Sequence, residues 1–186
     1  YIGDVGEDGA EEVNVVPAGV GGLNFGWNVI EGDQCVGGVT GCSLPCPDPT
    51  AGYVDPIWQY GHGLAGCCVI GGHVYRGSAI PQLQGKYLFA DYCRANLWTM
   101  TWDGVSVTGF ADVTDDLRPG LGLGLDSIVS FGTDAAGEIY IVDNAGQDLG
   151  KGEVFKVVPG DAFLEGGHAL AGTHGEPLLQ GSGTLV

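Results

Sequence analysis

The side chains best suited to chemistry are carboxylates gathered near the start of the chain. One group lies in a glycine-containing loop at positions 4–12, and a second consists of Glu31 and Asp33. Carboxylates and backbone carbonyls from glycine-rich turns are the ligands that calcium takes, roughly six to eight oxygens per ion. We therefore expect a calcium site in which Glu11 or Glu12 joins Glu31 and Asp33, with a solvated acidic turn as the alternative.

A histidine and an arginine are the other candidates for a functional site. His62 stands just before two adjacent cysteines, where it can act as a base, a ligand or a hydrogen-bonded structural group; the structural role is favoured. Arg76 ends an apolar run, so it either faces an anionic cofactor or braces Asp91. The four tryptophans can stack on a sugar ring, but we assign them to the core.

The cysteines predict disulfides. All six lie in one stretch, and no two have the CxxC spacing typical of a zinc site. Three disulfides place the protein outside the cytosol, in an extracellular or periplasmic compartment. We expect Cys93 to bond Cys67 or Cys68, which leaves Cys46 for the other, while the first two cysteines flank a turn that can close a small loop. The six are Cys35, Cys42, Cys46, Cys67, Cys68 and Cys93.

The chain is strongly acidic, with 23 Asp and Glu against 6 Lys and Arg and a net charge of −17. Nucleic acid is excluded as a partner, because phosphate binding needs clustered Lys and Arg. An anionic membrane surface is excluded for the same reason, and no apolar run has the length of a membrane helix. The acidity suits divalent cations and the solubility of an exported protein.

Short apolar runs separated by turns predict an all-β fold, and 36 Gly and 9 Pro support many turns. One antiparallel sheet is predicted from four runs, the last two joined by Asp103-Gly104, at 69–75, 86–90, 97–102 and 105–110. A second set is predicted at 127–131, 138–142 and 153–158. An earlier and less regular set is predicted at 11–16, 24–29 and 56–60.

Repeated four-stranded units of roughly 40–45 residues are typical of propeller blades. At that size the chain holds about three to four blades of four antiparallel strands, which is part of a ring, and a plain β-sandwich is the alternative. We assign 1–159 to the propeller, 160–175 to a linker and 176–186 to the start of a further domain. Residues 1–4 look like the middle of a strand, so we expect a preceding segment or another chain to close the ring.

Seven motifs occur in order along 1–159 and together carry a family resemblance. They are Tyr1-Ile2-Gly3-Asp4-Val5-Gly6 with Glu11-Glu12-Val13-Asn14, Asn24-Phe25-Gly26-Trp27 with Glu31-Gly32, Gly71-Gly72-His73-Val74-Tyr75-Arg76-Gly77, Gly85-Lys86-Tyr87-Leu88-Phe89-Ala90-Asp91-Tyr92-Cys93, Ser127-Ile128-Val129-Ser130-Phe131-Gly132, Gly137-Glu138-Ile139-Tyr140 and Gly152-Glu153-Val154-Phe155. In this order and at these spacings they resemble the C-terminal half of the glucose/sorbosone dehydrogenase family.

The resemblance implies part of an exported six-bladed propeller with calcium and pyrroloquinoline quinone near its axis. It also implies oxidation of a hydroxyl of an aldose or related sugar, in which a general-base histidine takes the proton and the quinone takes the hydride. In the family that base lies in the N-terminal half, so the catalytic residue is expected outside this chain. The calcium-bearing loop of the family matches Gly6 and Glu7 through backbone carbonyls, and the cofactor contacts match Arg76, Asp91 and Arg94.

The sequence differs from the quinone-binding members of the family at two places, and these differences bear on which of two functions the protein has. Asn96 stands where many members have Arg, and 123–126 lack the basic residues of the quinone-binding members. A tricarboxylate cofactor without those cations is poorly held. The sequence therefore supports two hypotheses, the distal half of a quinone-dependent sugar dehydrogenase, or a non-catalytic extracellular propeller like hedgehog-interacting protein, which serves as a binding or adhesion module.

Overall fold

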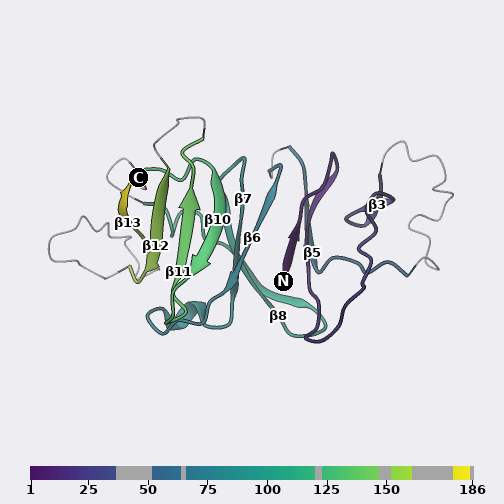
Figure 1. Ribbon diagram of the computed structural model, residues 1–186, viewed down its shortest axis with the longest axis horizontal. Coiled ribbons are helices and arrows are strands. Elements are labelled where there is room, and N and C mark those ends of the chain that lie inside the picture. Colours follow the sequence, from purple (N-terminus) through teal and green to yellow (C-terminus); the bar gives the residue numbers. More distant parts are fainter. Residues whose placement is uncertain (37–51, 64–65, 120–122, 147–151, 161–177, 185–186) are drawn as a thin grey trace.

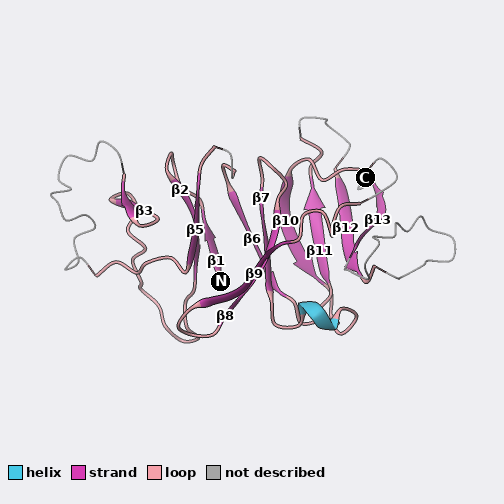
Figure 2. Cartoon of the chain, turned by 180° about the vertical axis from the view of Figure 1, so that it is seen from behind, coloured by secondary structure: helices cyan, strands magenta, loops and turns pink. Residues whose placement is uncertain are grey.

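The structure, a computed structural model, describes residues 1–36, 52–63, 66–119, 123–146, 152–160 and 178–184. Three antiparallel sheets lie side by side in chain order (Figure 1), and the view from behind shows the same arrangement (Figure 2). The predicted all-β fold is confirmed. A 3₁₀ turn, η1 (Pro81–Leu83), is the single helical element among the described residues.

The N-terminal sheet consists of β1 (Ile2–Asp4), β2 (Ala10–Asn14) and β5 (Trp58–Gly61), in the order β1-β2-β5. Between β2 and β5, two short strands, β3 (Ile30–Glu31) and β4 (Gln34–Cys35), form a separate hairpin. Only three strands are found in the N-terminal sheet among the described residues, so β5 is an edge strand.

The other two sheets each have four strands in sequential order. The middle sheet contains β6 (Val69–Val74), β7 (Tyr87–Asp91), β8 (Leu97–Trp102) and β9 (Val107–Asp112). The C-terminal sheet contains β10 (Ile128–Thr133), β11 (Ile139–Asp143), β12 (Glu153–Val158) and β13 (Leu178–Thr184). Because β13 pairs with β12, the stretch that we expected to begin a further domain includes the outer strand of this sheet.

The two inner strands of the middle sheet, β7 and β8, are buried along most of their length on both faces, which explains their nearly continuous apolar runs. Alternate residues of β7 enter different cores, because successive side chains of a strand point to opposite faces. Tyr87 and Phe89 pack toward the N-terminal sheet with Val13 and Trp98. On the opposite face, Leu88 and Ala90 pack with the apolar side chains of the C-terminal sheet, including Ile128, Ile139, Ile141 and Phe155.

The sheets approach most closely at their first strands. A Cβ atom added to Gly3 of β1 would lie 2.8 Å from the backbone nitrogen of Gly71 in β6. Only glycine permits this approach of two backbones. These two glycines therefore set the distance between the N-terminal and middle sheets.

One strand prediction was wrong. Residues 24–29 form an irregular segment and a turn, in which the Asn24 side chain accepts a hydrogen bond from the Gly26 amide at 2.9 Å. Gly26 has a φ of +97°, a conformation that a regular strand does not contain. The apolar run continues instead into β3, whose Ile30 packs directly against Gly26. No helix in the described part of the chain is long and apolar enough to cross a membrane.

Candidate functional site

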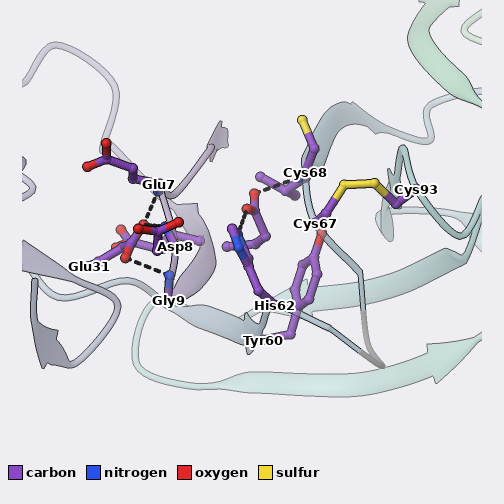
Figure 3. A network of polar contacts seen from close by, with 12 residues as sticks. Glu7, Asp8, Gly9, Glu31, Tyr60, His62, Cys67, Cys68 and Cys93 are labelled. Carbon is purple, nitrogen blue, oxygen red and sulfur yellow. Dashed lines mark hydrogen bonds and ion pairs between the residues drawn. A yellow bond between two sulfur atoms is a disulfide. The ribbon is translucent and has the colours of Figure 1, made fainter. Parts of the chain in front are cut away.

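The acidic loop between β1 and β2 closes around one carboxylate from a distant part of the chain. Glu31, on β3, accepts hydrogen bonds from the backbone amides of Glu7, Asp8 and Gly9, at 3.2 Å from Asp8 and 2.9 Å from Gly9 (Figure 3). Gly6 lies so close to the same carboxylate that a Cβ there would clash with it. The side chains of Glu7 and Asp8 are exposed. The loop is therefore held by its amides, and its own carboxylates point to solvent.

The two adjacent acids of β2 lie on opposite faces of the sheet, as strand alternation requires. Glu11 faces the middle sheet, and Glu12 faces the β3–β4 hairpin, where it accepts hydrogen bonds from the Gly32 amide and from the Asn14 side chain. Burial raises the pKa of Glu12, and repulsion by Asp4 and Glu31 adds to the rise. Glu11 and Glu12 therefore cannot serve as ligands of one ion.

A tiny hollow of about 10 Å³ lies between Asp4, Glu12 and Glu31. Among the described residues, however, no three side chains of the metal-binding types converge closely enough to hold an ion. Of the six expected ligands, Glu12, Glu31 and Gly6 lie around this hollow, Glu11 lies on the other face, and Glu7 and Asp33 are exposed. The side chains of the expected set therefore do not converge within the described residues, whereas the contacts expected of Gly6 and Glu7 run through backbone carbonyls, so the calcium site stays a prediction.

Glu11 connects two sheets. Its carboxylate is fully buried, accepts a hydrogen bond from the Val69 amide of β6 at 2.7 Å and lies 2.5 Å from Nε2 of His62. Both oxygens are thus engaged, one by the backbone of the middle sheet and the other by an imidazole that follows β5 (Figure 3). This contact agrees with the hydrogen-bonded structural role that the sequence favours for His62.

Asp91, at the end of β7, is a second fully buried carboxylate. It accepts hydrogen bonds from the hydroxyl of Tyr60 at 2.9 Å and from the amides of Cys67, Cys68 and Arg94 at 2.8, 3.0 and 2.8 Å. Gly66 also packs against the carboxylate, where no Cβ fits. With four donors on one carboxylate, Asp91 orders the segment before β6 and the turn after β7.

The two arginines expected to contact a cofactor lie at opposite ends of the middle sheet. Val69 pairs with Asp91 at one end, and Val74 pairs with Tyr87 at the other. Arg94 follows the first end and Arg76 the second, so a distance of the order of 15–20 Å, the length of a strand of this size, separates them. Arg76, Asp91 and Arg94 therefore do not form one cofactor site.

The cysteines agree in part with the expectation. Cys67 and Cys93 form a disulfide with a Cα–Cα distance of 5.7 Å, which selects one of the two predicted partners. Cys35 is also disulfide-bonded, while Cys42 and Cys46 lie outside the described residues. The thiol of Cys68 is free, so the bond to Cys46 that was expected of it is not formed; its side chain points away from the Cys67–Cys93 pair (Figure 3).

The surroundings of the free thiol disfavour its thiolate form. Burial raises the pKa of Cys68, and the negative charges of Glu11 and Asp91 raise it further. A reactive cysteine requires a thiolate, which positive neighbours favour. The pKa of Tyr60 is raised by the same combination of burial and a carboxylate partner, so the hydroxyl remains a hydrogen-bond donor to Asp91.

A further buried carboxylate, Glu138, was not singled out from the sequence. It is 6% exposed and accepts hydrogen bonds from the Tyr75 hydroxyl at 2.6 Å and from the amides of Ser78 and Ala79 at 3.0 and 3.1 Å. The sequence feature that could have indicated its burial is Gly77, which lies so close to this carboxylate that a Cβ would not fit.

Comparisons with known proteins relate the chain to one group. No family model matches it. The HIPL1 protein of Arabidopsis thaliana is 30% identical over 167 residues, which cover 77% of this chain and 23% of that protein. A crystal structure of glucose dehydrogenase matches with a TM-score of 0.55 and 17% identity, over 83% of this chain and 39% of the solved chain. The chain thus spans well under half the length of each relative.

The fold match explains the arrangement of the three sheets, which correspond to part of a propeller dehydrogenase. The sequence match covers most of the chain and agrees with the motifs that carry the resemblance. The chain is therefore related in sequence to part of an HIPL protein and shares the fold of part of a glucose dehydrogenase, in agreement with the glucose/sorbosone dehydrogenase resemblance.

Proposed function

We propose that the protein containing this chain is an exported propeller that works as a binding module and does not oxidise sugars. The observation that carries the proposal is how three buried carboxylates of the described residues are used. Glu11, Asp91 and Glu138 are each held by backbone amides together with an imidazole or a hydroxyl from another part of the chain. These groups stabilise the sheets and are not available to a substrate or a cofactor.

The cofactor chemistry supports the same proposal. Pyrroloquinoline quinone carries three carboxylates, which need cations at short distance. The arginines available in this region, Arg76 and Arg94, extend from opposite ends of the middle sheet, and Arg94 contacts the carbonyl of Gly63 at 3.3 Å. The described residues therefore do not fit the quinone.

Sugar oxidation is the second candidate, favoured by the fold match to a protein described as a glucose dehydrogenase. In this case the catalytic base and the cofactor cations belong to the part of the propeller beyond this chain. The substrate would be an aldose or a related sugar.

Export to an oxidising compartment belongs to both candidates. The Cys67–Cys93 disulfide supports it, since such bonds persist in secreted proteins and are rare in the cytosol.

The deciding experiment uses the whole protein that contains this chain, produced through a secretory pathway. It is incubated with pyrroloquinoline quinone, calcium and a panel of aldoses, and reduction of an electron-accepting dye is followed, with a quinone-dependent glucose dehydrogenase as positive control. We expect no reduction above background and no quenching of tryptophan fluorescence by the quinone. Aldose-dependent dye reduction at stoichiometric quinone would establish the second candidate and refute the binding module.

A further inference from the structure

The outer edge of β5 presents unpaired backbone groups. The amide of His62 donates to the carbonyl of Gly9 at 3.2 Å, which extends the β2–β5 register beyond Gly61. In an antiparallel ladder, alternate residues direct their amides and carbonyls to the same partner. Trp58 and Tyr60 are therefore bonded to β2, whereas Gln59 and Gly61 direct theirs away from it. In the described part of the chain, no strand lies on that side of β5.

Two hollows adjoin this edge. One of about 390 Å³ is lined by Gln59 and Trp58 of β5 and by Asp33. The other, of about 640 Å³, lies between the segments next to β2 and β5 and the turn that joins β8 to β9. Its walls are mainly apolar side chains and include Val15, Val20, Leu23, Val54, Trp102 and Val107. Asp55, Pro56 and Ile57 line both hollows, so the two adjoin along the approach to β5, and together they are called the depression.

The charged residues that line this depression indicate which charge its binding partner carries. Asp33 and Asp55 are the charged residues that line it, and both are exposed. The chain as a whole carries a net charge of −17, so the field around the depression is negative. A lysine or arginine side chain is attracted to such a surface, and a segment with several carboxylates is repelled.

We propose that an extended polypeptide segment with alternating apolar and basic residues binds here as a fourth strand of the N-terminal sheet. Its backbone pairs with Gln59 and Gly61 of β5, its apolar side chains enter the hollow beside Ile57, and its basic side chains lie near Asp33 and Asp55. Addition of a strand to an open edge is a general mode of peptide recognition, in which the main chain supplies affinity and the pockets supply specificity. This proposal deepens the proposed binding function by naming the partner and its site.

The test uses the disulfide-bonded whole protein and a fluorescein-labelled peptide of about eight residues in which valine alternates with lysine and threonine. Binding is measured by fluorescence anisotropy, and amide hydrogen exchange is followed by NMR. We expect saturable binding together with new protection of the Gln59 and Gly61 amides. The Trp58 and Tyr60 amides, already bonded to β2, serve as the internal control and should not change.

Two matched controls separate strand addition from general attraction. A peptide with N-methyl groups on alternate amides cannot pair its backbone, and its binding should be lost. The protein variant Asp33→Lys/Asp55→Lys, altered at exposed positions, should weaken the lysine peptide about tenfold, as expected for two exposed charge pairs. The same variant should bind a matched glutamate peptide more tightly than the original protein does.

Equal binding of the N-methylated peptide, or binding without protection of Gln59 and Gly61, would overturn the proposal. Absence of binding by a protein that is also inactive in the dye assay would overturn this inference and leave the binding-module function standing. Aldose-dependent dye reduction would instead refute the proposed binding-module function. The peptide measurement would then still decide whether a strand adds to β5.

Discussion

Glu138 offers the most direct test of how the sheets are held together. Its carboxylate, on the C-terminal sheet, accepts three hydrogen bonds from the middle sheet and from the loop that follows β6. In Glu138→Ala, the Tyr75 hydroxyl loses its acceptor in a buried position, and the amides of Ser78 and Ala79 lose theirs in partly buried positions. An unsatisfied buried donor costs about 1–3 kcal/mol, and because such costs do not add fully, we expect a loss of about 3–5 kcal/mol in unfolding free energy.

The assay is urea unfolding at neutral pH, followed by tryptophan fluorescence and circular dichroism. With a slope of about 2 kcal/mol per molar urea, the expected loss shifts the midpoint by about 2 M. Glu138→Gln keeps one oxygen and the shape of the side chain, so it should lose about 1–2 kcal/mol. The matched control is Asp115→Ala, which removes the same charge from a side chain that is 93% exposed and should change stability by less than about 0.5 kcal/mol.

The result that would refute this reasoning is a loss in Glu138→Ala no larger than the loss in Asp115→Ala. It would mean that water reaches the freed amides and that the carboxylate does not connect the sheets.

Three further predictions concern titration and the disulfide. Burial and a hydrogen bond to a carboxylate raise the pKa of Tyr75 to about 12, so the unfolded chain releases this proton first; stability should hold up to about pH 10 and fall from there to about pH 12. Tyr75→Phe should show a smaller fall in urea unfolding across that range, and an equal fall would contradict the assignment. Burial raises the pKa of Glu12, so its ionised form is disfavoured in the folded protein. The unfolding free energy of Glu12→Gln, measured relative to the original protein, should therefore rise between pH 4 and pH 7. A relative unfolding free energy that falls over this range would mean that folding lowers the pKa of Glu12. The double variant Cys67→Ala/Cys93→Ala opens a loop of 26 residues and should lose about 3.5 kcal/mol by the loop-entropy relation, whereas Cys68→Ala should lose less than about 1 kcal/mol; equal losses would mean that the disulfide does not constrain the chain.

The strands could be predicted from the sequence because their signal is local. Residues 153–158 form β12 as predicted, and residues 97–102 form β8, since alternation and flanking turns are enough to define a strand. The segment 24–29 failed for a local reason too, because an asparagine and a glycine form a turn where the apolar pattern suggests a strand.

The candidate site was harder to predict, because it depends on which strands become neighbours. Arg76 and Arg94 are close in sequence and both follow an apolar run. The antiparallel pairing of β6 with β7 nevertheless places them at opposite ends of one sheet. Glu11 and Glu12 must lie on opposite faces of a strand, but only the topology decides that one face meets the middle sheet and the other the β3–β4 hairpin. Register and topology decide such questions, and neither is visible in the spacing of charged residues.

The use of the buried carboxylates gives the acidity of this chain a structural meaning. Glu11 of the N-terminal sheet accepts the amide of Val69 at the start of the middle sheet, and Glu138, next to β11 of the C-terminal sheet, accepts the amides of Ser78 and Ala79 from the loop that joins β6 to β7 of the middle sheet. The same device thus connects both pairs of neighbouring sheets. A carboxylate accepts hydrogen bonds from several amides at once and forms stronger hydrogen bonds than a neutral acceptor does. One such side chain can therefore connect the backbones of two neighbouring sheets. A high content of acids in a protein of this architecture therefore does not by itself indicate metal binding, and the carboxylates that remain exposed, such as Asp33 and Asp55, are the ones available to a partner.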